Sequence, residues 1–207
     1  MPAKPTIVVV DTNCFIRLLF SPLRPVLGAT FGGYQLMTLA DLAAECGPDT
    51  EVVERHPWLL QSDVQAELAK NCLSFREPKK TEMGLHARRF RVTGNALLRK
   101  HCEAKKMKRV RELSRSDANA LAAAQTLGVP LATDEWPLTL VAREQSDVPL
   151  VMTSISIVHF MERDGKISAQ QRIEVVASWV KHGEALPDGW RDEYRHLFGK
   201  TPPDAQS

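Results

Sequence analysis

Near its N-terminus the chain has a run of apolar β-branched residues that ends on an acid. The stretch IVVVDTN, residues 7–13, has the composition of a strand buried on both faces of a sheet, yet it stops at Asp11. A buried carboxylate is costly unless it is paired or bound to a metal ion. The rest of the chain must therefore supply a partner for Asp11.

Strand-like and helical patterns alternate along the chain. Strand-like runs lie at residues 6–10, 58–61, 129–133 and 148–152, and a helical pattern follows each of them. Helix starts are marked by Ser62 and Ser168 in capping-box sequences and by Ser114, three residues before Asp117. Continuous apolar strands separated by helices predict an α/β fold with a parallel β-sheet flanked by helices.

Two segments do not fit this alternation. Residues 21–57 form a long connection with one helical piece at 38–46, and we interpret them as a helical insertion. Aromatic and apolar residues recur at helical spacing near the C-terminus, so residues 168–207 are predicted to be a C-terminal helical extension. The remaining prediction is a single domain over residues 1–167.

Composition and cysteine usage restrict the class of protein. The chain has 207 residues, of which 43% are hydrophobic and 25% are charged, as in a soluble globular protein. No apolar run approaches the roughly 20 residues that span a membrane, and the N-terminal apolar run is too short for a signal peptide. The four cysteines lie far apart, which disfavours a zinc site or a disulfide framework. A cytoplasmic protein without membrane contact is expected.

Positive charge is concentrated in one segment. Residues 76–111 hold thirteen Lys or Arg and three acids, although the net charge of the whole chain is only +2. Such a block is often the solvated face of a surface helix, but this concentration favours contact with a polyanion or an acidic protein. Arg88, Arg89 and Arg91, grouped beside Phe90, are the best candidates for binding the phosphates of such a polyanion.

Four acids are candidate site residues, and each has an ordinary structural explanation. Asp11 could cap the helical run at residues 14–20, and Glu67 could pair with Lys70 on its helix. Asp117 lies in a helical first turn, where the dipole favours an acid, and Asp134 could be a turn residue. None of these acids, taken alone, indicates a function.

Their joint placement is more informative. Asp11 and Asp134 both follow strands, and ligands of open parallel sheets bind at the carboxyl ends of strands. Asp117 opens the helix that leads to Asp134, and it joins them if the loops bend it to the same edge. Carboxylates that converge without His or Cys would suit Mg²⁺ or Mn²⁺ rather than Zn²⁺, and such a cation would also stabilise Asp11.

Several motifs together resemble the PIN-domain ribonucleases, especially the VapC-type toxins of toxin–antitoxin pairs. The resemblance rests on VVVDTN, QAEL, SRSDANALAAAQTLGVPLATDE and VPLVMTSISIVHFME, and it covers most of residues 6–167. It implies a parallel sheet flanked by helices, with acids clustered around Mg²⁺ or Mn²⁺. It also implies catalytic or metal-binding roles for Asp11, Glu67, Asp117 and Asp134, with Asn13 and Thr133 as polar support.

The activity that this resemblance implies is metal-dependent hydrolysis of RNA. A cation lowers the pKa of water and stabilises charge on the phosphate, while the basic segment holds the RNA backbone. Candidate partners are RNA, a cognate antitoxin protein and a second copy of the chain in a homodimer. Two further acids compete for places in the site, Glu135 beside Asp134 and Asp63 near Glu67.

Other functions fit the sequence less well. A haloacid-dehalogenase-type phosphotransferase would carry a second Asp two residues after Asp11, where this chain has Asn13. A response-regulator receiver needs a differently placed acidic pair. The main alternative is a PIN-like module that binds RNA or a protein without cleaving anything, and a metal-dependent cleavage assay distinguishes the two.

Overall fold

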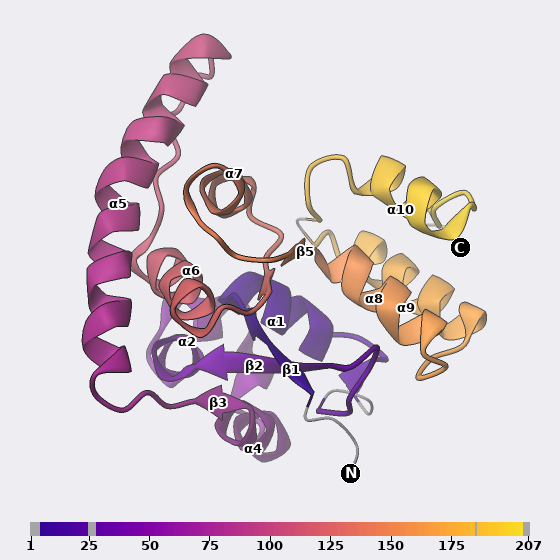
Figure 1. Ribbon diagram of the computed structural model, residues 1–207. Helices are drawn as coiled ribbons and strands as arrows, with labels where there is room; N and C mark the ends of the chain where they lie inside the picture. The colour runs from indigo at the N-terminus through magenta and orange to yellow at the C-terminus, as the bar shows by residue number, and fades with distance from the viewer. Residues whose placement is uncertain (1–4, 25–27, 185, 205–207) are drawn as a thin grey trace.

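The chain folds around a five-stranded, all-parallel sheet with helices on both faces (Figure 1). The computed structural model describes residues 5–24, 28–184 and 186–204. No helix in these ranges is long and apolar enough to cross a membrane. The parallel sheet with flanking helices confirms the α/β fold class that the alternation of apolar runs and helical patterns predicts.

The strand order in the sheet is β3-β2-β1-β4-β5, so the first strand lies in the centre. Its neighbours are β2, where Val8 pairs with Leu36, and β4, where Val10 pairs with Ala132. The strands are β1 (Thr6–Val10), β2 (Tyr34–Leu39), β3 (Cys72–Leu73), β4 (Leu131–Ala132) and β5 (Val151–Met152).

Helices separate the successive strands along the chain. The first half of the chain contains α1 (Thr12–Leu19), α2 (Ala40–Glu45), α3 (Glu51–Arg55), the 3-10 helix η2 (Pro57–Leu60) and α4 (Ser62–Lys70). The second half contains α5 (Lys79–Ala104), α6 (Arg115–Leu127), α7 (Trp136–Gln145), α8 (Ser154–Arg163), α9 (Ala169–Lys181) and α10 (Trp190–Phe198).

The alternation of side chains along β1 creates two hydrophobic cores. Val8 and Val10 belong to the core that α1, α4, α8 and α9 cover, and Val9 belongs to the core of α2, α5, α6 and α7. All three valines are fully buried. Burial on both faces explains why the strand is a continuous apolar run.

The second strand lies where an insertion is predicted. The sequence pattern places this strand at residues 58–61, but Pro57–Leu60 is a 3-10 helix that begins with a proline. Proline fixes its own backbone and lacks an N–H, which suits the first turn of a helix. The sheet instead takes Tyr34–Leu39 from the segment 21–57, followed by α2 within the predicted helical piece 38–46.

Two of the three predicted helix starts have the expected hydrogen bonds. Ser114 and Ser168 both form capping boxes, with Asp117 and Gln171 respectively. Ser62 does not, because the cap residue of α4 is Gln61 and its side chain makes no capping bond. The Gln65 amide donates instead to the carbonyl oxygens of Cys46 and Leu59, at 3.0 and 2.7 Å.

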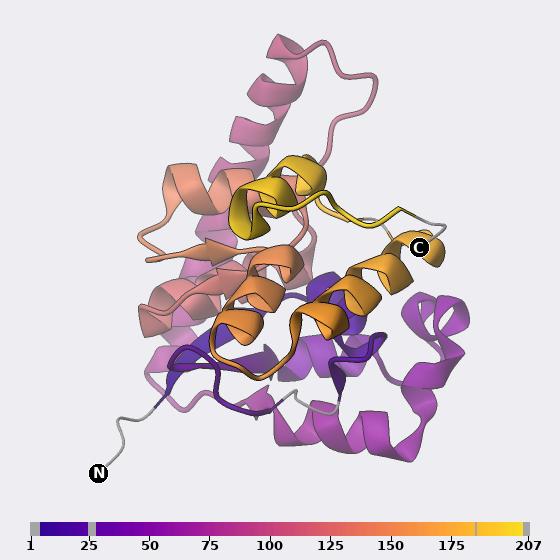
Figure 2. The same cartoon turned by 90° about the vertical axis from the view of Figure 1, so that its right-hand side faces the viewer.

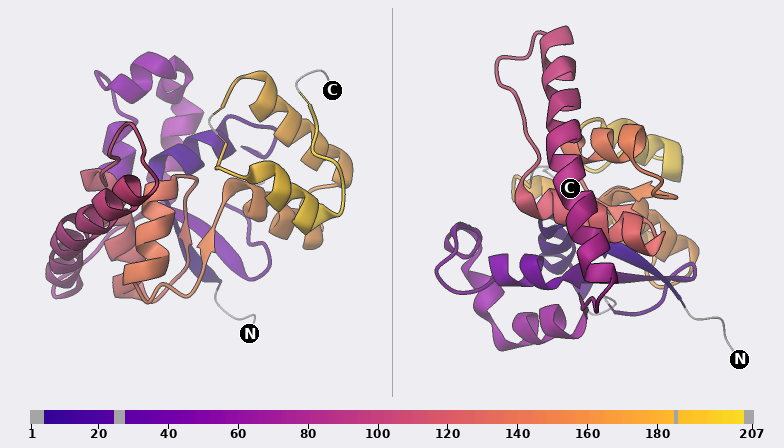
Figure 3. Two further views of the ribbon diagram at one scale, coloured as in Figure 1. Left: turned by 90° about the horizontal axis from the view of Figure 1, so that it is seen from above. Right: turned by 60° about the vertical axis from the view of Figure 1, so that its left-hand side comes forward.

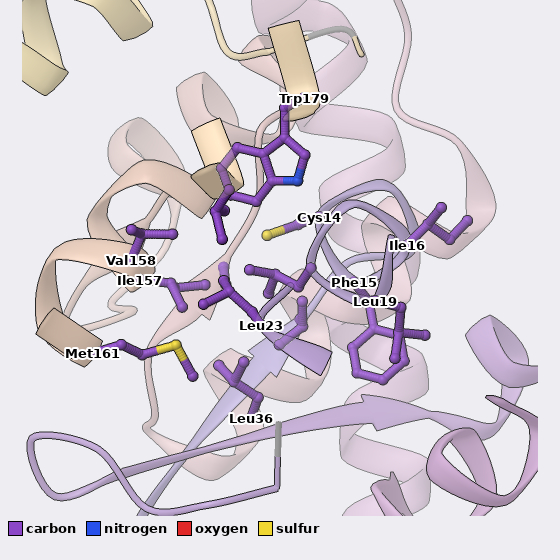
Figure 4. Close-up of a cluster of buried hydrophobic side chains, with 14 of the residues drawn as sticks. Cys14, Phe15, Ile16, Leu19, Leu23, Leu36, Ile157, Val158, Met161 and Trp179 are labelled. Carbon is purple, nitrogen blue, oxygen red and sulfur yellow. The ribbon is translucent and has the colours of Figure 1, made fainter. Parts of the chain in front are cut away.

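The C-terminal helices pack on the core beside α1. Figure 4 shows the Trp179 ring of α9 above Cys14, with Ile157 and Val158 of α8 nearby. Trp179 is fully buried, and its indole N–H donates to the carbonyl oxygen of Arg17 at 3.0 Å. Helix α9 therefore shares a core with the first strand and its helix.

Candidate functional site

Asp11 lies at the carboxyl end of the central strand, where its side chain has two hydrogen-bond donors. One carboxylate oxygen accepts from the Cys14 backbone N–H at 2.7 Å, so Asp11 caps α1 as an ordinary N-cap residue would. The other oxygen accepts from the Thr133 hydroxyl at the end of β4. With only 2% of its surface exposed, Asp11 is the buried acid that the sequence raised as a question.

Asp117 reaches the same edge from the first turn of α6. Its carboxylate accepts from the Ser114 backbone N–H at 2.9 Å, and its own N–H donates to the Ser114 hydroxyl at 3.0 Å. This capping box fixes the carboxylate at the helix start. The structural role of Asp117 and its place beside Asp11 are thus compatible.

Glu45, at the end of α2, is a site residue that the sequence motifs do not identify. Its two carboxylate oxygens accept from the hydroxyls of Thr12 and Ser116, and the Thr12 bond measures 2.7 Å. These bonds connect α2 with the starts of α1 and α6. The signal that could have identified Glu45 is its helix, which follows a strand that the sequence patterns assign to an insertion.

Glu135 is the fourth acid at this edge. Its carboxylate accepts from the Asn13 side-chain amide at 2.9 Å, which connects the loop after β4 with α1. The sequence leaves open whether Glu135 points into the site, and the structure directs it there. Asn13, predicted as polar support, contacts this acid.

These four carboxylates line one hollow of about 540 Å³, which we call the acidic hollow. Its lining residues come from the carboxyl edge of the sheet, from the starts of α1 and α6 and from the short helices α2 and α3. Figure 3 shows the ribbon of the whole chain from two further sides. Two arginines, Arg55 and Arg111, also line it. The acids that line it are Asp11, Glu45, Glu51, Glu112, Asp117 and Glu135.

Asp134 does not line the acidic hollow. Its carboxylate forms a buried ion pair with Arg17 of α1 and accepts from the Ser154 backbone N–H at 2.8 Å. It borders a different hollow, between α7 and the segment before α10. Asp134 and Glu135 are neighbours in sequence, but their side chains point to different hollows, and it is Glu135 that faces Asp117.

Glu67 and its competitor Asp63 both lie on α4, outside the acidic hollow. Glu67 accepts from the Asn71 side-chain amide at 3.0 Å, and Asp63 pairs with Arg24. The sequence patterns misplace them, because they assign the strand before α4 to the wrong residues. Thr133, in contrast, contacts a residue of the hollow, because its hydroxyl donates to Asp11.

The electrostatics of the acidic hollow follow from burial and from the closeness of like charges. The pKa of Asp11 is raised to about 7, mainly by burial. The hydrogen bonds from Thr133 and Cys14 lower this pKa, whereas the nearby charges of Asp117 and Glu135 raise it further. The pKa of Asp117 is also raised, mainly by burial and then by Glu135 and Glu45, against the bonds from Ser114. The two aspartates therefore hold protons more tightly than free acids.

The donor set fits a hard divalent cation by its chemistry. All the close donors are carboxylate, hydroxyl or amide oxygens, which Mg²⁺ and Mn²⁺ prefer. As the side chains lie, no three His, Cys, Asp or Glu groups of the described residues are close enough together to hold a metal ion. Glu45 and Glu135 are turned toward hydroxyl and amide donors, so cation binding would require these two side chains to exchange those hydrogen bonds for the cation.

The protein is thus a parallel α/β domain with an acidic hollow at the carboxyl edge of its sheet. No family model, curated protein or solved structure matches the chain. The resemblance to PIN-domain ribonucleases therefore stays a prediction from the sequence motifs.

Proposed function

We propose that this protein is a metal-dependent ribonuclease that hydrolyses RNA phosphodiester bonds at the acidic hollow. The observation that carries the proposal is the meeting of Asp11, Glu45, Asp117 and Glu135 from four separate elements in one hollow. Ionised carboxylates that lie close together in a hollow repel one another, so the binding of a cation there is favourable. The choice of RNA rests on the resemblance in sequence.

The residues that would hold Mg²⁺ or Mn²⁺ are Asp11 and Asp117, with Glu45 and Glu135 turning toward the ion. When bound, the cation would neutralise charge on the phosphate and lower the pKa of water. Thr133 and Ser114 orient the two aspartates through the bonds described above. The raised pKa of Asp117 indicates that its ionised carboxylate would be stabilised by a cation that neutralises its charge.

Phosphate binding is the role we assign to the two arginines of the hollow. Arg55 and Arg111 line it beside the acids, and guanidinium groups bind phosphate oxygens in a bidentate manner. Six acids would otherwise repel a polyanion. The combination of arginines with bound cations would make the hollow attractive to an RNA backbone.

Cleavage of a labelled RNA by the purified chain in Mn²⁺ and in EDTA tests the proposal. We expect Asp117→Asn and Glu45→Gln each to reduce the Mn²⁺-dependent rate roughly 100-fold or more, because each removes ligand charge. Glu67→Gln is the matched control, since Glu67 lies on α4 away from the hollow, and it should keep the wild-type rate. Absence of cleavage by the wild type, or equal rates in all three variants, would refute the proposal.

A non-catalytic module that binds RNA or a protein is the alternative. It is favoured by the hydrogen bonds that hold Glu45 and Glu135 away from a common point. If the protein is a toxin, a cognate antitoxin would cover the acidic hollow, and a homodimer is a further proposal. The four free cysteines agree with the reducing cytoplasm, where we propose that the protein acts.

A further inference from the structure

The C-terminal part of α5 and the segment after it stand clear of the body of the molecule (Figures 1 and 2). We call residues 99–111 the arm. The helix runs outward to Ala104, and the chain then returns beside it. The return is fixed where the Leu113 backbone N–H donates to the Asn95 side-chain oxygen at 2.8 Å. From Asn95 to the helix end, α5 extends by about 14 Å at 1.5 Å per residue.

The arm is basic, and little within the chain neutralises it. It contains seven Lys or Arg and one acid, Glu103. In the described part of the chain, Arg99 is the arm cation with an ion pair, to Glu112 at 2.7 Å. Unpaired, exposed cations so close together favour contact with a polyanion. These cations are Lys100, Lys105, Lys106, Lys108, Arg109 and Arg111.

The returning segment connects this charge directly with the acidic hollow. Arg111 lines the hollow, and Glu112 and Ser114 follow it there. Ser114 is the residue that fixes Asp117. A phosphate chain that lies along residues 105–111 would therefore arrive at the carboxylates of the hollow.

The composition of the arm favours nucleic acid over a protein partner. Four of its six unpaired cations are lysines, which are depleted in the cores of protein–protein interfaces. Its exposed apolar side chains, Met107 and Val110, stand singly among cations and form no continuous apolar face. Lysines on a projecting segment hold phosphates as point charges and need no fixed partner geometry.

The burial of Asp11 indicates which form of RNA the hollow admits. Because Asp11 is only 2% exposed, a phosphate that approaches it must leave the surface and enter the recess. An unpaired strand can bend one phosphate inward, whereas a duplex holds its backbone in a regular helix. Unpaired RNA is also the form whose bases can be splayed apart by a protein.

We propose that the arm is the main phosphate-binding surface of this protein and leads unpaired RNA into the acidic hollow. The proposal rests on the proposed function. It also revises the sequence prediction, which favours Arg88, Arg89 and Arg91. These three lie on the part of α5 packed against α6 and α7, and Phe90 beside them is fully buried and cannot stack on a base.

The test is RNA binding without cleavage, by fluorescence anisotropy of a labelled, unstructured RNA of about 20 nucleotides in EDTA over a range of salt concentrations. The arm variant is Lys105→Gln, Lys106→Gln, Lys108→Gln. The matched control is Arg88→Gln, Arg89→Gln, Arg91→Gln. It also removes three positive charges, but from within α5 rather than from the segment that follows it. All six residues are exposed, so both variants should keep the wild-type melting temperature.

We expect the arm variant to bind at least about tenfold more weakly, with a salt slope smaller by about 2, at roughly 0.7 per lost phosphate contact. The control variant should lose less than half as much RNA affinity. A duplex of equal length should compete poorly with the unstructured RNA for binding. Equal losses in the two variants, an unchanged salt slope in the arm variant, or stronger binding of the duplex would overturn the proposal. Binding through the arm without any cleavage in Mn²⁺ would support the arm and refute only the nuclease.

Discussion

Asp134 and Glu135 illustrate how strongly the direction of a single side chain determines its role. Asp134 is compensated by the Arg17 guanidinium in a buried pair, whereas Glu135 lies among other acids. A buried ion pair is weak evidence for stability, but the removal of one partner leaves a buried charge and is strongly destabilising. We therefore assign Asp134 to the structure of the sheet edge and Glu135 to the site.

The pH dependence of stability is expected to change when Asp11 is replaced by Asn. The pKa of Asp11 is about 7 in the folded protein, whereas an unfolded aspartate has a pKa of about 3.9. Between these values the folded state keeps a proton that the unfolded state has lost, so stability falls as the pH rises. Above the folded pKa, the ionised carboxylate lowers the free energy of unfolding by roughly 4 kcal/mol relative to acid pH.

Urea unfolding in EDTA at pH 5 and pH 8 measures this effect. Asp11→Asn should be more stable than the wild type at pH 8 and should lose less stability between the two pH values. A variant with the same pH dependence as the wild type would show that Asp11 is not the group responsible.

At the scale of elements, the sequence predicts those parts whose signal is local. The buried run before Asp11, the caps at Ser114 and Ser168 and the last two strands depend on nearby residues, and the structure has them where expected. The second strand is missed because Tyr34–Leu39 mixes polar and apolar residues and lacks the continuous apolar run of β1.

That error also determines which acids are missed at the site. Glu45 depends on contacts with Thr12 and Ser116, residues 33 and 71 positions away along the chain, and no local pattern encodes them. Asp11 and Asp117 lie together in the hollow because both are fixed by their own helix starts.

The close packing of α5 on α7 depends on Gly94, where the two helices cross. A Cβ at this position would lie 2.9 Å from a Val141 methyl carbon and 3.1 Å from one of Leu113. Gly94→Ala should therefore destabilise the protein by about 1–3 kcal/mol, despite the higher helix propensity of alanine. A Cβ at Gly84, in the same helix, would point into open space, and Gly84→Ala should stabilise the protein by up to about 1 kcal/mol.

Thermal unfolding followed by circular dichroism compares these two variants directly. If Gly94→Ala were as stable as Gly84→Ala, the close crossing of α5 and α7 would be contradicted, and with it the position from which the arm projects.

At the scale of the whole molecule, the C-terminal helices and the first helix share one core. Val175, Val176 and Trp179 of α9 are fully buried in the cluster that also contains Cys14 and Phe15 (Figure 4). A segment with this much buried surface contributes to the stability of the entire fold. Removal of this segment would expose the buried face of α1, the helix that Asp11 caps.

Substitution of Trp179 tests this shared core. Trp179→Phe removes the hydrogen bond to the Arg17 carbonyl and should lower the free energy of unfolding by about 1–2 kcal/mol. Trp179→Ala also leaves a cavity and should lower it by about 3–5 kcal/mol. Both variants should unfold in a single transition in urea. Two transitions, with only the C-terminal helices lost in the first, would show that these helices form a separate unit.

The central claim is that the acidic hollow binds a divalent cation, and thermal unfolding at pH 8 with and without Mn²⁺ tests it most directly. A cation that binds only the folded chain stabilises it by about 2.7 kcal/mol at 100 times its dissociation constant. We predict an upward shift in the wild type and in the control Asp63→Asn/Glu67→Gln, and no shift in Asp11→Asn/Asp117→Asn. Identical wild-type melting in EDTA and in millimolar Mn²⁺, or an undiminished shift in Asp11→Asn/Asp117→Asn, would contradict the claim.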